Sequence, residues 1–132
     1  MDLKAVCMGR IYNIVCVDDN KMITELFESF FKLSGTKANI YTFNDSTTAM
    51  EFIHSKKKID VLITDYKMPV YNGIDLLEAT SGDTIRILVS GYVSEIAEEK
   101  LLKLNTIIFE KPVPMQKIGK IIFEKCNNRI KS

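Results

Sequence analysis

Short apolar runs alternate with segments of helical periodicity along this chain, and the alternation limits the folds that it can adopt. Within the helical segments, apolar residues recur every three or four positions, as they do on one face of an amphipathic helix. Five runs are predicted to be strands, and they cover Tyr12–Val17, Ala38–Phe43, Asp60–Thr64, Ile85–Ser90 and Thr106–Phe109. This order favours an α/β fold, with a parallel sheet that is covered by helices on both faces and joined by right-handed crossovers.

The second run differs from the others in composition. It carries polar Asn39 and Thr42 among its apolar residues, whereas the other four runs are almost continuously apolar. A strand that is buried on both faces of a parallel sheet is apolar throughout. We therefore predict that the second strand lies at an edge of the sheet.

The helices are predicted from apolar periodicity and from capping residues. They cover Lys21–Leu33, a segment from a cap among Asn44–Ser46 to about Lys56–Lys58, Gly73–Thr80, a segment capped by Ser94, and a segment that follows Pro114. The first helix is expected to turn inward the apolar residues Met22, Leu26, Phe27, Phe30 and Leu33. The last helix is expected to turn inward Met115, Ile118, Ile121 and Ile122.

Composition indicates an ordinary globular protein without a strong charge. The 132 residues are 46% hydrophobic and 27% charged, and the net charge of +1 offers no bulk field for nucleic acid or for an anionic membrane. The sequence shows no membrane-spanning stretch and no secretion signal. An odd number of cysteines without metal-ligand spacing, at Cys7, Cys16 and Cys126, favours the reducing cytoplasm. Without repeats or linkers, the sequence predicts a single domain over residues 1–132, and its two ends favour a complete chain.

Polar residues follow four of the five predicted strands at the point where each strand ends. Asp18–Asp19 follow the first strand, Asp65 the third, Ser90 closes the fourth, and Lys111 comes just after the fifth. The carboxyl ends of parallel strands share one edge of the sheet, where open α/β folds place their ligand sites. We therefore expect these side chains to converge on one site.

Three converging carboxylates require a cation. Two unit charges about 4 Å apart interact by about 4 kcal/mol at an effective dielectric constant of about 20. A few hard oxygen ligands at a partly exposed site suit Mg²⁺, which also prefers to share its site with a phosphate. Asp65 is then a candidate nucleophile for phosphoryl transfer, while the metal, Lys111 and Ser90 would contact the oxygens of the transferred group.

Four motifs in this order resemble the receiver domains of two-component response regulators. They are V-D-D at Val17–Asp19, D-Y-K-M-P-V-Y-N-G at Asp65–Gly73, S-G-Y at Ser90–Tyr92 and E-K-P at Glu110–Pro112. The resemblance covers about residues 13–127. It implies a flavodoxin-like, doubly wound, five-stranded parallel sheet with the strand order 2-1-3-4-5.

The resemblance also implies a role for each residue of the site. Asp65 would be the phosphoacceptor. For Mg²⁺, Asp19 would coordinate directly, Asp18 through a water, and the backbone carbonyl of Lys67 would be a further ligand. Ser90 would sense the phosphoryl group and Lys111 would pair with it. The Lys111–Pro112 bond is a candidate cis peptide bond.

The function implied by the resemblance is signal transduction rather than enzymatic turnover. The domain would take a phosphoryl group from a sensor histidine kinase or a histidine phosphotransfer protein, and its only catalysis would be this transfer and autodephosphorylation. Either a downstream protein would bind the face formed by the fourth helix, the fifth strand and the fifth helix, or the domain would pass the phosphoryl group on in a relay, and the sequence does not separate these two outcomes. No direct contact with nucleic acid or membrane is expected, and the location would be cytoplasmic.

The chain departs from the family pattern at one position near the site, and it carries bulky residues at two positions that vary in the family. Receivers commonly carry an aromatic residue three positions before the lysine, and here that residue is Ile108. Phe109 is adjacent, but strand alternation should point it to the opposite face. Lys67 and Tyr92 are bulky, and we expect them to obstruct the water that hydrolyses an acyl phosphate.

Other functions are weighed against the same residues. A receiver-like interaction module that is never phosphorylated would have no need of the complete set of acids, Ser90 and Lys111. A haloacid-dehalogenase-type Mg²⁺ phosphatase would carry a second acid two residues after Asp65, where this chain has Lys67. His54, the only histidine, lies beside lysines on a predicted helix, and we interpret it as a surface residue rather than a phosphohistidine carrier.

Overall fold

The computed structural model of the protein describes residues 11–35, 37–55, 57–91 and 98–131. For residues 98 and 126–131 it describes the helix and not the side chains. The predicted helix cap at Ser94, and Tyr92 beside the site, lie outside the described residues.

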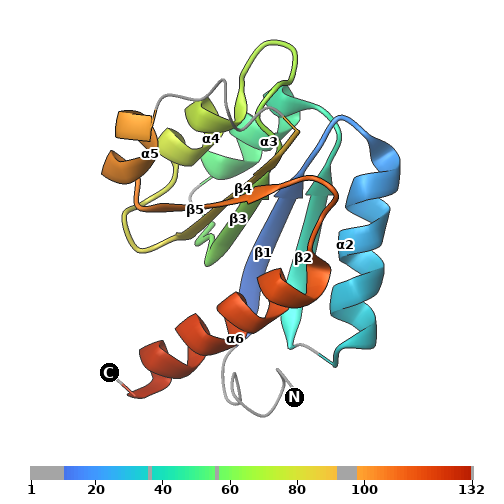
Figure 1. The fold of residues 1–132 in the computed structure, drawn as a ribbon, viewed down its shortest axis with the longest axis vertical. Coiled ribbons are helices and arrows are strands. Elements are labelled where there is room, and N and C mark those ends of the chain that lie inside the picture. The colour runs from blue at the N-terminus through green and yellow to red at the C-terminus, as the bar shows by residue number, and fades with distance from the viewer. Residues whose placement is uncertain (1–10, 36, 56, 92–97, 132) are drawn as a thin grey trace.

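The described residues form one parallel sheet of five strands in the order β2-β1-β3-β4-β5 (Figure 1). The strands are β1 (Tyr12–Val17), β2 (Ala38–Phe43), β3 (Val61–Thr64), β4 (Ile85–Ser90) and β5 (Thr106–Glu110). This order confirms the predicted fold, including the position of the second strand at an edge. Of its six residues none is fully buried, whereas all four residues of the central strand β3 are.

Five helices cover the two faces of this sheet in the part of the chain that the structure describes. They are α2 (Lys21–Leu33), α3 (Ser46–Ile53), α4 (Gly73–Ala79), α5 (Glu98–Lys103) and α6 (Met115–Lys131). Figure 1 shows α2 and α6 on one face and α3, α4 and α5 on the other. None of these helices is long and apolar enough to cross a membrane.

The sheet separates two apolar cores, and strand alternation divides the side chains between them. Ile14 and Cys16 of β1 pack with α2 and α6, whereas Val15 and Val17 pack with α3, α4 and α5. Near the other edge, Phe109 packs on the α2 and α6 side and Ile108 on the opposite side. The prediction that Ile108 and Phe109 face opposite ways is therefore confirmed.

Side chains of Asn and Asp begin three of the helices. Asn20, Asp45 and Asn72 precede α2, α3 and α4, and each accepts a hydrogen bond from a backbone N–H of the first turn. The predicted cap of the second helix among residues 44–46 is thus Asp45. That helix was expected to continue to about Lys58, but it ends at Ile53, because the chain must leave the helix to enter β3.

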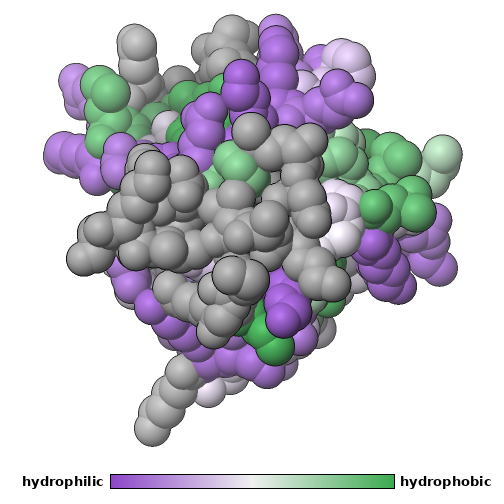
Figure 2. Space-filling model, turned by 90° about the horizontal axis from the view of Figure 1, so that it is seen from below, coloured by the Kyte–Doolittle hydropathy of each residue, from purple (hydrophilic) through white to green (hydrophobic). Residues whose placement is uncertain are grey.

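The inward face of α2 differs in part from the predicted one. Phe27 is buried and Phe30 packs against the core, as predicted, and Phe31 is also buried. Met22, Leu26 and Leu33, which were expected to face inward, are 72%, 54% and 88% exposed. The apolar arc of this helix is wider than the surface that the sheet offers, so only its central part is covered. Viewed from below, Figure 2 shows hydrophobic surface on the right, the side on which α2 lies in Figure 1.

The last helix follows the prediction more closely. Ile118 and Ile122 of α6 are fully buried, and Met115 and Ile121 are partly buried. Gly119 lies so close to α2 that an added Cβ would come within 2.8 Å of the Phe30 ring. The absence of a side chain at Gly119 therefore lets the two helices approach.

Gly73 at the start of α4 packs against the backbone of Asp65. Its N–H donates a hydrogen bond to the Tyr66 carbonyl at 2.8 Å. A Cβ at this position would lie 2.2 Å from the backbone oxygen of Asp65, far inside contact distance. A backbone atom cannot move aside as a flexible side chain can, so only glycine fits here.

We predict that Gly73→Ala lowers the free energy of unfolding by about 1–3 kcal/mol, the usual cost of overpacking. Urea denaturation would measure the change. Gly82→Ala is the matched control, because a Cβ at Gly82 meets nothing within 4 Å. Equal stability of the Gly73 variant and the wild type would contradict the close packing described here.

Candidate functional site

Three carboxylates meet at the carboxyl ends of two neighbouring strands. Val17 of β1 is paired with Thr64 of β3, so Asp18–Asp19 and Asp65 leave the sheet side by side. One carboxylate oxygen from each aspartate lies within 4.8 Å of the others. Asp18 and Asp65 are 3% and 7% exposed, and Asp19 is exposed. The sequence prediction that these acids converge is confirmed.

Lys111 reaches this cluster from the end of β5. Its Nζ lies 2.9 Å from Asp18 Oδ2 and 3.5 Å from Asp65 Oδ2. The ammonium thus balances part of the charge that two nearly buried carboxylates create. The peptide bond that follows it, Lys111–Pro112, is cis, as predicted.

The acidic loop is fixed through every polar atom of Asp18. Its N–H donates to the Phe43 carbonyl at 3.1 Å, and its own carbonyl accepts from Asn44 Nδ2 at 2.8 Å. Oδ1 accepts the Asn20 N–H at 2.9 Å, and Oδ2 contacts Lys111. The side chain of Asp18 therefore has one orientation in this structure.

Asp65 is held by its neighbours in sequence and in the sheet. Its N–H donates to the Val17 carbonyl at 2.9 Å, and Oδ1 accepts the Tyr66 N–H at 2.8 Å. Oδ2 faces Lys111. Burial raises the pKa of Asp65, the charge of Asp18 raises it further, and Lys111 offsets part of this effect.

The negative charge of the cluster raises the pKa of Lys111. Burial lowers the pKa of Lys111, but the hydrogen bond and charge of Asp18, together with the charge of Asp65, outweigh burial. The net direction is a pKa above the ordinary value for lysine. The ammonium therefore stays charged at the site.

Ser90 and Lys67 lie on the adjacent chain segments. Ser90 ends β4, is fully buried, and accepts the Lys111 N–H on its carbonyl at 3.0 Å. Lys67 follows Asp65 by two residues, and its side chain is exposed. The structure thus places both residues in the segments expected from the sequence.

Sequence reasoning missed two side chains that support the site from the end of β2. Asn44 contacts the acidic loop, and Ser46 Oγ donates to the Pro69 carbonyl at 2.5 Å and accepts the Tyr71 N–H at 3.1 Å. Ser46 thereby holds the loop between β3 and α4, which includes Val70 at a positive φ of 70°. The sequence signal for this support was the presence of two polar side chains, Asn44 and Ser46, within three residues of the end of β2.

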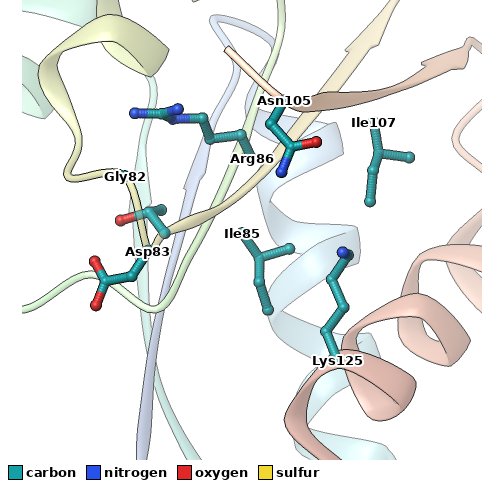
Figure 3. A pocket seen from close by; sticks show the side chains of 8 residues that line it. Gly82, Asp83, Ile85, Arg86, Asn105, Ile107 and Lys125 are labelled. Carbon is teal, nitrogen blue, oxygen red and sulfur yellow. The ribbon is translucent and has the colours of Figure 1, made fainter. Parts of the chain in front are cut away.

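The described hollows lie away from the acidic cluster. One of about 300 Å³ opens at the amino-terminal ends of β4 and β5, between Asp83, Arg86, Asn105 and Lys125 (Figure 3). The Arg86 guanidinium there donates to the backbone carbonyls of Thr80, Ser81 and Leu104. Arg86 thus has a structural role in joining the ends of α4 and α5 to the sheet.

Comparison with known proteins agrees with the geometry. The family described as response regulator receiver domain matches residues 14–123. Chemotaxis protein CheY of Pseudomonas aeruginosa is 30% identical over 124 residues, which cover 86% of this chain and 98% of that protein. The crystal structure of a response regulator receiver domain protein from Clostridium thermocellum superposes with a TM-score of 0.75 at 25% identity, over 92% of this chain and 98% of that one.

A more distant structure has the same fold. A CheY-like receiver domain protein from Methanospirillum hungatei superposes with a TM-score of 0.74 at 22% identity, over 92% of this chain and 98% of the other. The chain therefore belongs to the response regulator receiver domain family of two-component signalling. Receiver domains are phosphoacceptors that generally bind Mg²⁺ through an acidic cluster, and Asp18, Asp19 and Asp65 form such a cluster here.

The raised pKa of Asp65 predicts a dependence of stability on pH. Because the folded protein holds this proton more tightly than the unfolded chain, stability falls as pH rises from the ordinary carboxyl pKa of about 4 through the folded pKa. In metal-free buffer we expect Asp65→Asn to be more stable than the wild type at pH 7. The advantage should shrink as pH falls toward 4, measured by urea denaturation at several pH values.

Asp45→Asn is a control, because the pKa of Asp45 is shifted in the opposite direction to that of Asp65. Hydrogen bonds from Thr47 lower the pKa of Asp45, so its ionised form stabilises the fold above the ordinary carboxyl pKa, and the Asn variant should gain nothing at pH 7. An Asp65→Asn variant that is less stable than the wild type at pH 7 would contradict the electrostatic description of the site.

Proposed function

We propose that Asp65 accepts a phosphoryl group from a phosphohistidine partner, either a sensor histidine kinase or a histidine phosphotransfer protein. The observation that carries this proposal is the position of the Asp65 carboxylate, which lies between two further carboxylates and the Lys111 ammonium. A nucleophilic carboxylate needs a cation to neutralise the incoming phosphoryl oxygens. The cluster supplies the ligands for one cation and carries a second in Lys111.

The donor set fits Mg²⁺. It consists of hard carboxylate oxygens at a partly open edge, and the exposed Asp19 leaves room for the waters that Mg²⁺ retains. In this proposal Asp19 and Asp65 bind the ion directly, Asp18 holds a bound water, and the Lys67 carbonyl is a further ligand. When bound, Mg²⁺ would neutralise phosphoryl oxygens.

The transfer exchanges one bond at phosphorus. An Asp65 oxygen forms the new P–O bond while the P–N bond of the phosphohistidine breaks, and its electron pair stays on the imidazole, which is protonated as it leaves. Lys111 and the Ser90 hydroxyl contact oxygens of the transferred group. Since Lys111 Nζ is already 3.5 Å from Asp65 Oδ2, only a small displacement is needed for this contact.

The response is proposed to reach a downstream protein through the face formed by α5, β5 and α6. Leu102 on this face is 77% exposed, and a hollow of about 180 Å³ lies beside it between Leu101, Asn105, Thr106 and Ile108. Apolar exposure next to a hollow suits the side chains of a protein partner.

The protein is proposed to act as a single receiver domain in the cytoplasm. In that reducing compartment the buried thiol of Cys16 stays reduced.

We predict that incubation with Mg²⁺ and acetyl phosphate adds one phosphoryl group to the wild type, detected by intact-mass spectrometry. Asp65→Asn should abolish the addition, because it removes the nucleophile, and a chelator should abolish it in the wild type. Asp75→Asn is a suitable control, because Asp75 caps α4 away from the cluster. Failure of the wild type to accept a phosphoryl group, or labelling that survives Asp65→Asn, would refute the proposal.

A second prediction concerns the lifetime of the acyl phosphate. The exposed Lys67 follows Asp65 by two residues, and together with Tyr92 it is expected to hinder the approach of water. The double substitution Lys67→Ser and Tyr92→Ala should shorten the half-life of the phosphorylated form several-fold, measured by the loss of label after removal of the donor. Lys117→Ser, at an exposed position on α6, should leave the half-life unchanged. No acceleration in the double variant would refute this prediction.

A further inference from the structure

Asn44 links the end of β2 to the acidic loop although it is not itself acidic. Its Nδ2 donates one hydrogen bond to the Asp18 carbonyl at 2.8 Å and another to Thr24 Oγ1 at 2.9 Å. Both amide protons are therefore used. Thr24 is 3% exposed, and its hydroxyl donates to the Lys21 carbonyl at 3.0 Å. The Asn44 amide thus joins the acidic loop to the first turn of α2.

A role for Asn44 in beginning the next helix does not explain these contacts. The cap of α3 is Asp45, whose side chain accepts the Thr47 N–H at 3.1 Å. Both hydrogen bonds of the Asn44 amide point away from α3 and toward residues near the acidic cluster. The side chain therefore supports the site rather than its own helix.

Of the two acceptors of the Asn44 amide, the Asp18 carbonyl has the more direct effect on the acidic cluster. It belongs to the peptide group that joins Asp18 to Asp19, so the hydrogen bond from Asn44 fixes the plane of that peptide. Asp19 itself is exposed, and its carboxylate has no hydrogen-bond partner among the residues that the structure describes. The direction in which Asp19 leaves the chain is thus set by the backbone. Asn44 holds this backbone at the Asp18 carbonyl, and the Asp18 carboxylate holds it at the Asn20 N–H.

We propose that Asn44 is a positioning residue for the metal site, which orients the Asp18–Asp19 peptide so that the Asp19 carboxylate meets that of Asp65. This inference rests on the proposed function, because it presumes that the cluster binds Mg²⁺. Groups that orient metal ligands without touching the metal commonly contribute about 10–100-fold in metal affinity. Asn44 acts through the backbone of the neighbouring ligand.

The test is the affinity for Mg²⁺ alone, measured by isothermal titration calorimetry on the unphosphorylated protein. Asn44→Ala should weaken binding about five- to tenfold, at the low end of that range because Asn44 acts through one peptide group. Asn39→Ala is the matched control, since Asn39 lies on β2, the strand that Asn44 follows, and its Nδ2 donates to Asn13 Oδ1 at 3.0 Å rather than to the acidic loop. Thr24→Val, which keeps the bond to the Asp18 carbonyl and loses the second anchor, should produce a smaller decrease.

Phosphorylation kinetics separate positioning from a general loss of structure. With acetyl phosphate as donor, Asn44→Ala should raise the Mg²⁺ concentration for half-maximal rate about five- to tenfold and leave the rate at saturating Mg²⁺ close to that of the wild type. A lower rate that saturating Mg²⁺ does not restore would overturn the proposal. The proposal would also be overturned if the wild type binds Mg²⁺ and is phosphorylated, but Asn44→Ala binds Mg²⁺ with the same affinity. A wild type that binds no Mg²⁺ would overturn the proposed function as well.

Discussion

The contact of Lys111 with Asp18 and Asp65 is the interaction on which the arrangement of the site depends. Burial raises the pKa of Asp65, and repulsion from the nearby Asp18 carboxylate raises it further. Lys111 comes from β5, whereas the acids follow β1 and β3, so its side chain extends past the end of β4 to reach them. The Lys111–Asp18 ion pair therefore joins residues that are 93 positions apart in the chain. The fold thus holds the carboxylates and their counter-charge together at one edge of the sheet.

Uncharged residues around the cluster hold this arrangement in position. Gly73 lets α4 begin against the Asp65 backbone, and Asn20 both accepts a hydrogen bond as the cap of α2 and donates its N–H to Asp18. Asn44 and Ser46 add support from the end of β2 to the acidic loop and to the loop after β3. The loop after β2 is thereby hydrogen-bonded to the loops after β1 and β3. We therefore expect a change in the charge at Asp65 to act first on these connected backbone segments.

The proposed route from the site to a partner surface passes residue 108, where this chain has Ile108 in place of the aromatic residue expected from the resemblance to receiver domains. Ile108 packs in the core with Leu101 of α5, and its β-branched side chain is stiff about χ1. It cannot make the swing that an aromatic ring makes at that position. Ile108 also lines the hollow beside Leu102. Coupling in this protein is therefore expected to depend on movement of the chain around Ser90 rather than on one rotamer.

The sequence alone determined the order of strands and helices and the edge position of β2, because strands that are buried on both faces of a sheet must be continuously apolar. It also determined the residues of the acidic cluster, because parallel strands end at a common edge of the sheet. It did not determine which face of α2 is buried. Met22, Leu26 and Leu33 fit a helical apolar stripe as well as Phe31 does, and only packing against the sheet and Gly119 decides between them. The role of Asn44 could not be predicted from the sequence either. A polar residue after a strand can cap, turn or support, and its use depends on hydrogen-bond partners that only the tertiary structure brings within reach.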